Sequence, residues 1–399
     1  MRSWDKEDSA EVVTEPSRLS LARMAAIFLK IGAIGFGGGM AVIALMEHDL
    51  VEKRKALPAE EFLHGVGLGQ VLGPFAVNAA FFVGYRCHGP LGALVASTAF
   101  LLPSVTMVTA LSFLYFRYHT IPALQGILLG LGPVVIALIL AAAWSMGKKT
   151  ILSWPAAALA LAGALAGALR LNAVWVLLAA GALGLLLGRK RLARKRTKKG
   201  AVREGKPKTL ASMILPISSL GGTISTVFLT DVCLTFLKVG LVFFGGGFVL
   251  IPILNHRLVE QLHWLTPQEF LDGVAISNLT PGPIAVLATF TGFHLHGVSG
   301  ALLATVALFT PAILLMALIS VGYERLKESS WTQNFLSGVG PTVVGLVASA
   351  AMILWRSAVP SWRALLLTAV ALVLLVRFKW HPAFVLGLGA ALAAARIVP

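Results

Sequence analysis

The chain contains a series of long apolar segments with few or no charged residues, among them 89–116 and 121–146. About 20 apolar residues of α-helix cross the ~30 Å hydrocarbon core of a bilayer, and a helix pairs its own backbone groups there. Charged residues make up only 13% of the chain, whereas soluble proteins carry roughly 25%. The sequence therefore predicts an all-α polytopic membrane protein. It excludes an ordinary soluble enzyme, a disordered regulator and a disulfide-stabilised secreted domain.

The second strong feature is an internal repeat with an offset of about 208 residues. Residues 28–52 and 236–260 align without gaps and are identical at 13 of 25 positions. The identities include a lysine, a histidine, a glutamate and three consecutive glycines, which apolar composition alone does not explain. The chain is therefore predicted to consist of two homologous membrane halves.

The repeat and the charge pattern divide the chain into four parts. We expect a polar N-terminal tail at 1–20, a first membrane repeat at 21–188, a basic cytoplasmic linker and re-entry segment at 189–227, and a second membrane repeat at 228–399. Eleven Lys and Arg residues and one acid lie between 189 and 208, which is +10 of the net charge of +16. Short basic loops beside membrane segments stay on the cytoplasmic side. The charge thus predicts a multi-pass protein of the cytoplasmic (inner) membrane rather than a nucleic-acid binder.

Duplicated membrane halves are typical of transporters. Such repeats pair about a pseudo-two-fold axis, and the substrate lies near the midplane, where Gly or Pro breaks the helices. We expect two inverted repeats with broken helices, although loop charges leave a parallel arrangement open.

Each half has a glycine-rich interruption in its first apolar segment. Three consecutive glycines cost roughly 1 kcal/mol each in a helix relative to alanine. They suit a break at which backbone N–H groups approach an anion. Close packing of helices through small residues is the alternative. The residues concerned are Gly37, Gly38 and Gly39, and Gly245, Gly246 and Gly247.

A second break is expected in the next segment of each half. The second half has Thr280-Pro281-Gly282-Pro283, and the first half has Gly73-Pro74 without the first proline. Proline cannot continue a helix, because it lacks an N–H and forces its predecessor into an extended conformation. The new helix that begins after the break carries a partial positive charge at its N-terminus. A simple kink is the alternative.

Two repeated lysines add positive charge near these breaks. Lys30 and Lys238 occupy equivalent positions inside apolar segments, where an ionisable residue is costly and marks a functional site by default. Snorkelling of the side chain toward the membrane surface is the competing interpretation. No Asp or Glu lies in the interior of the apolar segments, so the expected substrate is an anion. We expect both lysines to face one polar cavity.

Acidic residues and histidines gather at segment ends and are candidates for proton coupling or gating. Any one of them is also explained as a solvated helix end or cap. The candidates are Glu47, His48, Glu52, His256, Glu260 and Asp272.

Taken together, the Phe-Leu-Lys-x-Gly…Phe-Gly-Gly-Gly segments, Glu-Phe-Leu-Asp-Gly at 269–273, Thr-Pro-Gly-Pro at 280–283 and Gly84-Tyr85-Arg86 resemble the chromate ion transporter family in its long, two-domain form. The resemblance implies export of chromate, driven by the proton gradient or by anion exchange, and chromate resistance. It places Asn78 and Asn278 with the breaks as substrate-binding candidates. The sequence departs from the family pattern at Leu72-Gly73-Pro74 and at Asn78, where glutamine is common.

Two other functions stay open. A transporter of sulfate or another anion would share this architecture. An intramembrane enzyme would need a motif such as His-Glu-x-x-His or Gly-x-Ser-x-Gly, and neither occurs. The expected partners are the oxyanion and the lipid bilayer, with a homodimer left open. We expect no catalytic residue, metal or cofactor.

Overall fold

The computed structural model describes residues 19–35, 39–71, 73–118, 121–192, 226–243, 247–327 and 330–395. The polar tail up to residue 18, most of the basic linker and the centres of the two glycine runs therefore lie outside the described residues. Every regular element in the described ranges is helical. The predicted all-helical fold is confirmed.

The two halves have matching orders of elements. The first half contains α1 (Leu21–Ile34), α2 (Gly39–Met46), η1 (Glu47–Glu52), α3 (Ala59–Val71), α4 (Phe75–Tyr118), α5 (Pro122–Thr150), α6 (Trp154–Ala168) and α7 (Ala173–Leu192). The second half contains α8 (Thr226–Leu241), η2 (Gly247–Val249), α9 (Leu250–Leu254), η3 (Asn255–Gln261), α10 (Pro267–Leu279), η4 (Ile284–Val286), α11 (Leu287–Lys327), α12 (Ser330–Ala358), α13 (Trp362–Val376) and α14 (Pro382–Ala394).

Helix starts follow local sequence signals. Thr266 caps α10: its hydroxyl accepts from the Glu269 N–H at 3.2 Å, and the Glu269 carboxylate accepts from the Thr266 N–H at 2.7 Å. This capping box satisfies N–H groups that would otherwise lack partners. Proline stands at the start of α5, α6 and α14, where its missing N–H costs nothing.

The Gly-Pro breaks are hairpin turns, not kinks in spanning helices. Gly65 on α3 lies against the Phe82 ring on α4, and Gly273 on α10 lies against the Phe290 ring on α11. Such pairs can meet only if the chain turns back between them. The arms are short, since 13 residues of α3 or α10 extend only ~20 Å. The apolar segments 66–85 and 274–293 are therefore short re-entrant hairpins in this structure and not single spans.

A second reversal follows in each half, inside α4 and α11. His88 and Gly89 leave the helical backbone conformation. In α11 the hydroxyl oxygens of Thr289 and Thr305 lie 2.7 Å apart, although 16 residues of straight helix would separate them by ~24 Å. The chain therefore folds back near Gly297, and a long arm follows the turn.

The first half also reverses its direction between α1 and η1. The ammonium nitrogen of Lys30 on α1 lies 3.9 Å from the carboxylate of Asp49 on η1. A straight helix would place residues 19 positions apart ~28 Å from each other. Thus α1 and the α2–η1 arm lie beside one another, where we had expected one interrupted span.

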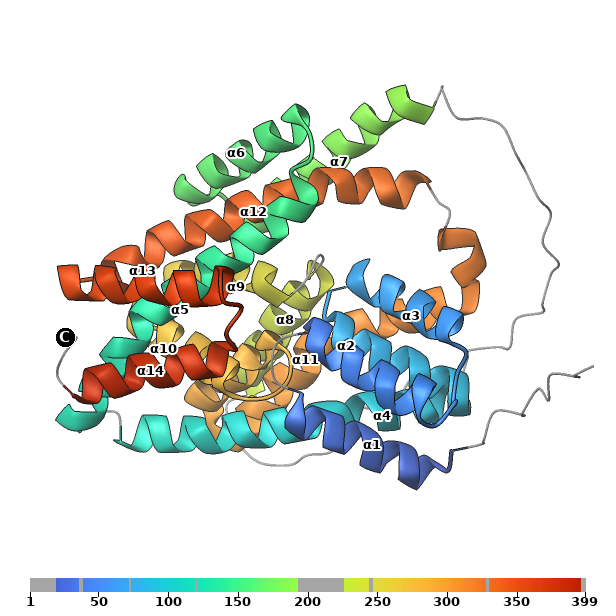
Figure 1. Cartoon of the computed structure of the whole chain (residues 1–399), viewed down its shortest axis with the longest axis horizontal. Coiled ribbons are helices and arrows are strands. Elements are labelled where there is room, and N and C mark those ends of the chain that lie inside the picture. The colour runs from blue at the N-terminus through green and yellow to red at the C-terminus, as the bar shows by residue number, and fades with distance from the viewer. Residues whose placement is uncertain are drawn as a thin grey trace, which may run out of the picture.

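The halves interleave at their C-terminal ends. In Figure 1, α12 of the second half lies along α6 and α7 of the first, and α13 and α14 lie beside α5. Small residues allow close approach: Gly163 on α6 contacts the backbone of Thr342, and Gly130 on α5 contacts Ala393. Each half therefore completes the packing of the other.

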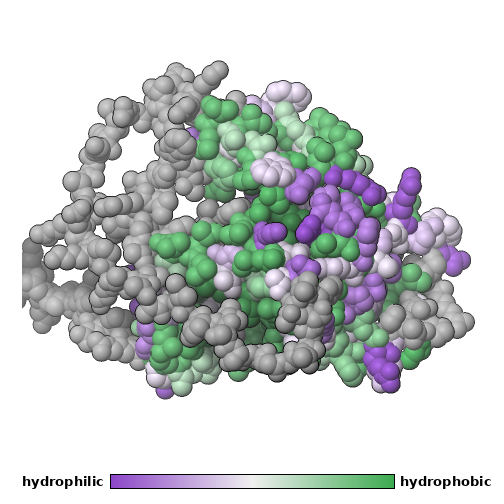
Figure 2. All heavy atoms as spheres, turned by 180° about the vertical axis from the view of Figure 1, so that it is seen from behind, coloured by the Kyte–Doolittle hydropathy of each residue, from purple (hydrophilic) through white to green (hydrophobic). Residues whose placement is uncertain are grey.

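The described surface suits a bilayer. The helices α4, α5, α11 and α12 are long and apolar enough to cross a membrane. Large apolar side chains such as Trp154, Leu161 and Leu169 are exposed on α6 and the turn that follows it. In Figure 2, apolar residues cover much of the described face and hydrophilic residues gather toward one side of it. These features confirm a multi-pass membrane protein.

The packing at the second reversal predicts that Gly→Ala substitutions at two helical positions have different effects on stability. At Gly292 an added Cβ would collide with the Gly300 carbonyl and lie 2.7 Å from the Ala304 Cβ, whereas Gly387 on α14 has nothing within 4 Å. Gly292→Ala should therefore destabilise the protein by about 1–3 kcal/mol. Gly387→Ala should be neutral or mildly stabilising because it favours the helix. Thermal unfolding in lipid nanodiscs measures both, and equal stabilities would contradict the hairpin packing.

Candidate functional site

The tips of the two re-entrant hairpins adopt the same unusual backbone conformation. Gly73 has φ +102° and Gly282 has φ +110°, a region that residues with a side chain rarely adopt. A proline follows each of them and immediately precedes a new helical segment. The two tips are therefore equivalent in structure as well as in sequence.

Each tip contacts a residue that lies just before the glycine run of the other half. The Gly282 N–H donates to the Gly35 carbonyl at 3.2 Å. Gly73 packs so closely on the Phe243 carbonyl that a Cβ would not fit. Gly35 and Phe243 are equivalent positions of the repeat. The two contacts are therefore equivalent in the repeat, and each of them joins the tip of one half to the other half.

The glycine runs also touch the hairpins of their own halves. Gly39 lies against the Phe75 ring, and Gly247 lies against Ile284. Phe75 and Ile284 are the first residues after the two tips. Both glycine runs and both tips therefore gather in one region. The other four glycines predicted for this site, Gly37, Gly38, Gly245 and Gly246, lie outside the described residues.

One side chain ties the second tip to the first half. The buried Ser104 hydroxyl on α4 donates to the Pro281 carbonyl. The equivalent position in the second half is Ala312, which has no hydroxyl. Only the second tip can have this bond from the long helix of the opposite half, so the two tips differ chemically.

The predicted amide and hydroxyl residues flank the tips. Asn78 is fully buried in the first turn after Pro74. Asn278 and Thr280 bond within their own hairpin: the Asn278 amide donates to the Val274 carbonyl at 2.8 Å, and the Thr280 hydroxyl donates to the Ser277 carbonyl at 3.2 Å. These bonds shape the turn before Pro281.

The gathered tips can bind an anion. The first N–H groups of a helix have no partner within the helix, and the helix N-terminus carries about half a positive charge. Helical segments begin at Phe75 and at Ile284, beside the two tips. Their N–H groups attract negative charge without a charged side chain or a metal.

The two lysines lie elsewhere. Lys30 is 63% exposed and pairs with Asp49, and Lys238 is exposed on α8. Neither lines either of the two cavities described below. The buried face of α1 consists of residues such as Phe28 and Ile31, which turns Lys30 outward. That both lysines face one shared polar cavity stays a prediction.

The repeated His-Glu pairs form in both halves, each in a π-helical turn. His48 and Glu52 lie 2.8 Å apart and are largely exposed, whereas His256 and Glu260 lie 2.9 Å apart with only 18% and 11% of their side chains exposed. Glu47 begins the first of these turns. Wide turns of this kind are frequent at functional sites.

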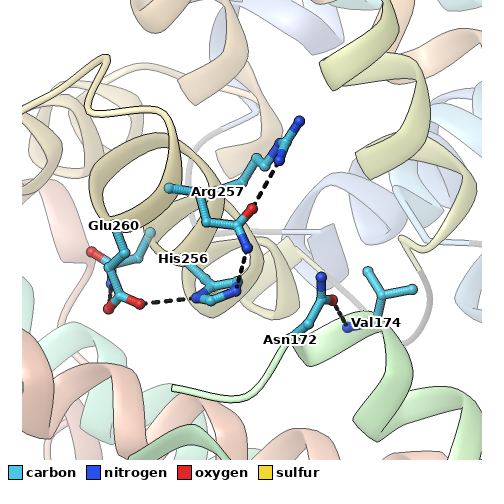
Figure 3. A network of polar contacts seen from close by, with 7 residues as sticks. Asn172, Val174, His256, Arg257 and Glu260 are labelled. Carbon is cyan, nitrogen blue, oxygen red and sulfur yellow. Dashed lines mark hydrogen bonds and ion pairs between the residues drawn. The ribbon is translucent and has the colours of Figure 1, made fainter.

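The second pair is part of a larger network, drawn in Figure 3. His256 also contacts the Gln261 amide at 3.0 Å, and Gln261 accepts from Arg257 at 2.8 Å. Asn255 donates to Glu260 at 3.2 Å. The turn between α6 and α7 and part of α12 cover this network and enclose a small cavity with it. Packing between the halves therefore buries one pair and leaves the other exposed.

Asp272 is the most buried of the predicted coupling residues, with 2% of its surface exposed. The Tyr115 hydroxyl of α4 donates to one carboxylate oxygen at 2.8 Å, and the Gln268 amide donates to the other at 3.0 Å. Sequence reasoning missed Tyr115. The sequence contained one sign of its importance, because Tyr115 lies near the end of a long apolar segment and the equivalent position of the second half is also a tyrosine, Tyr323.

Within the described part of the chain, no group of three or more His, Cys, Asp or Glu residues is arranged to hold a metal ion.

Comparisons with known proteins agree with this architecture. A family model described as "Chromate transporter" matches residues 22–185 and 230–395, one match in each half. The chain is 31% identical over 371 residues to a probable chromate transport protein of Synechococcus elongatus, covering 92% of this chain and 93% of the relative. It is 29% identical over 381 residues to a chromate transport protein of Cupriavidus metallidurans, with 94% and 92% covered. It is 31% identical over 358 residues to one of Pseudomonas aeruginosa, with 87% and 84% covered. No solved structure matches the chain.

The bond from Ser104 to the second tip gives a matched pair of variants. Ser104→Ala leaves the Pro281 carbonyl without this donor, which costs about 1–3 kcal/mol at a buried site. We expect a several-fold higher KM for the transported anion. Ser112→Ala is the control, since Ser112 is equally buried on α4 and its hydroxyl has no hydrogen-bond partner among the described residues. Transport kinetics in proteoliposomes compare the two, and equal KM values would remove Ser104 from the site.

Proposed function

The chain belongs to the chromate transporter family, and from this premise we propose that it exports chromate across the cytoplasmic membrane and so confers chromate resistance. The observation that carries the proposal is that each hairpin tip contacts the opposite half, Gly282 at Gly35 and Gly73 at Phe243, just before its glycine run. Transporters bind substrate where broken helices of two repeats meet. The cytoplasmic membrane follows from the basic linker and the positive-inside rule.

The substrate binds between the two tips. Two helix N-termini supply about half a positive charge each, and the backbone N–H groups supply hydrogen bonds to the oxygens. Gly73, Pro74 and Asn78 contribute from the first half, and Thr280-Pro281-Gly282-Pro283 with Asn278 contribute from the second. The sequence adds Gly37, Gly38, Gly39, Gly245, Gly246 and Gly247 to the proposed site, because residues without a side chain let backbone N–H groups approach an anion.

Transport proceeds by alternating access between two inverted repeats. One half rocks against the other around the tips, and the energy comes from the proton gradient or from anion exchange. The acidic and histidine residues at segment ends, Glu47, His48, Glu52, His256, Glu260 and Asp272, are the coupling or gating candidates.

Sulfate is the second candidate substrate. Chromate and sulfate are both tetrahedral dianions, and backbone N–H groups offer hydrogen bonds to either. The chemistry of the site therefore supports binding of tetrahedral oxyanions as a class, chromate and sulfate alike.

Labelled chromate uptake into inside-out vesicles tests the proposal, with sulfate as competitor. Wild-type protein should accumulate chromate. Gly282→Ala should not, because it places a side chain at a positive φ against Ser104. Gly67→Ala is the control on the other hairpin, since that position has open space. Sulfate uptake that exceeds chromate uptake would support the second candidate. Uptake of neither anion by inserted wild-type protein would refute the proposal.

The two lysines should contribute unequally. Asp49 offsets the charge of Lys30, whereas the position equivalent to Asp49 in the second half is Arg257. Lys238→Gln should therefore reduce oxyanion affinity more than Lys30→Gln. A loss of ~1 kcal/mol corresponds to a roughly fivefold higher KM. Chromate titrations at low and high salt measure the difference, and a larger effect at Lys30 would contradict this account of the charges.

A further inference from the structure

A cavity of about 300 Å³ leads to the buried carboxylate of Asp272. Its walls include Thr266 and Glu269 at the start of α10, Leu128 and Leu129 of α5, and Tyr115 of α4. Thr266 is exposed, whereas Asp272 is almost fully buried. A cavity of this size is large enough to hold several water molecules. Water, and with it protons, can therefore reach Asp272 from the surface end of α10.

Opposing influences act on the Asp272 carboxylate. Burial disfavours its charged form, and hydrogen bonds from Tyr115 and Gln268 favour that form. Among the described residues, no basic side chain forms an ion pair with Asp272. A buried carboxylate with a fixed cation partner stays charged. Where no cation is fixed beside the carboxylate, as at Asp272 among the described residues, a change in hydration or in the hydrogen bond from Tyr115 decides whether it holds a proton.

Few other titratable groups face Asp272. Glu269 lies on the same helix and is engaged in the capping box. From α11, Phe290 contacts Tyr115, and the His294 ring lies 4.5 Å from the Phe116 ring. The network around His256 belongs to η3, and the part of α5 that lines the cavity is apolar. The titratable residues of α12 and α14, which also pack on α10, are Arg356 near the end of the first and His381 at the cap of the second.

Asp272 is mechanically connected to the substrate site. It lies on α10, whose last residue immediately precedes Thr280 and the second tip. Eight helical residues span ~12 Å. Its partner Tyr115 lies on α4, the helix of the first half that also carries Ser104. The Tyr115–Asp272 bond therefore joins α4 to α10, and the Ser104–Pro281 bond joins α4 to the tip that follows α10.

We propose that Asp272 is the proton-binding residue that couples proton movement to oxyanion transport, and that Tyr115 is the positioning residue through which its protonation loosens the contact between the halves. The inference rests on the proposed function, since it names the coupling site of that transporter. It also adds Tyr115, which the sequence did not identify.

The step is a simple proton transfer. A proton from water in the cavity binds one Asp272 oxygen and converts the carboxylate to a carboxylic acid. The bond from Tyr115 then loses its charged acceptor, and charge-assisted hydrogen bonds are about twice as strong as neutral ones. The α10 hairpin is held less tightly against α4, and its tip can move relative to Gly35. Release of the proton restores the bond.

Two transport assays in proteoliposomes test this coupling. Asp272→Asn cannot exchange a proton, so chromate accumulation driven by a pH gradient should fall at least tenfold. Exchange of labelled for unlabelled chromate at equal pH should persist, because the tips are intact. Asp231→Asn is the matched control, since Asp231 is an exposed aspartate of α8, and it should behave as wild type. Unchanged gradient-driven accumulation in Asp272→Asn would overturn the proposal.

Infrared titration of the purified protein in lipid separates this inference from the proposed function, because it needs no substrate. The C=O band of a protonated buried carboxyl should appear as pH falls in wild type and in Asp231→Asn, and should be missing in Asp272→Asn. Tyr115→Phe should shift its appearance to higher pH, because the carboxylate loses a hydrogen bond. An identical band in Asp272→Asn would refute the proton site. If the band behaves as expected while no chromate moves, the proposed substrate fails and Asp272 still binds the proton.

Discussion

Backbone groups that leave a helix inside a bilayer must find partners within the protein, and this constraint explains how the two halves fit together. Each half carries a hairpin tip at which helical pairing stops. The Gly282 N–H donates a hydrogen bond to the Gly35 carbonyl, and the Pro281 carbonyl accepts one from the Ser104 hydroxyl. Gly73 packs on the carbonyl of Phe243 in the equivalent place. Because these partners come from the opposite half, neither half alone supplies all the contacts of its own tip. The crossing of α12 over α6 and α7, and of α13 and α14 over α5, holds the halves in that arrangement.

The same constraint supplies the chemistry of the proposed transport. Helical segments that begin beside the tips bring N–H groups to one region, which is the proposed site for an oxyanion and needs no charged side chain. A site built from backbone also couples binding to the relative position of the halves, since each tip is held by the other half. Tyr115 lies on α4 with Ser104, and Asp272 lies on α10, which leads into the tip that Ser104 contacts. In the proposed coupling, a change of charge at Asp272 acts on the contact that positions the second tip.

Much of this architecture could be predicted from the sequence, because apolar length and repetition are local signals. They identified an all-helical membrane protein, two halves and the positions of the breaks. They did not show that the chain turns back at Gly73-Pro74 and Pro281-Gly282, since proline and glycine permit a kink as readily as a reversal. Contacts between distant residues, such as Gly65 with Phe82, decide between the two. The outward position of Lys30 could also not be predicted from the sequence, because it results from the packing of α1 against the rest of the protein. Tyr115 acquires a role only through its contact with Asp272, 157 residues away.

The central claim is that the two tips bind the oxyanion together, and a cryo-EM map of the protein in nanodiscs with chromate tests it most directly. The chromium atom scatters strongly enough to be located. The account predicts chromate density between the starts of the helical segments after Pro74 and Pro283, within hydrogen-bonding distance of N–H groups from both halves. Density beside Lys30 or Lys238 and away from both tips, or contacts from one half alone, would contradict it.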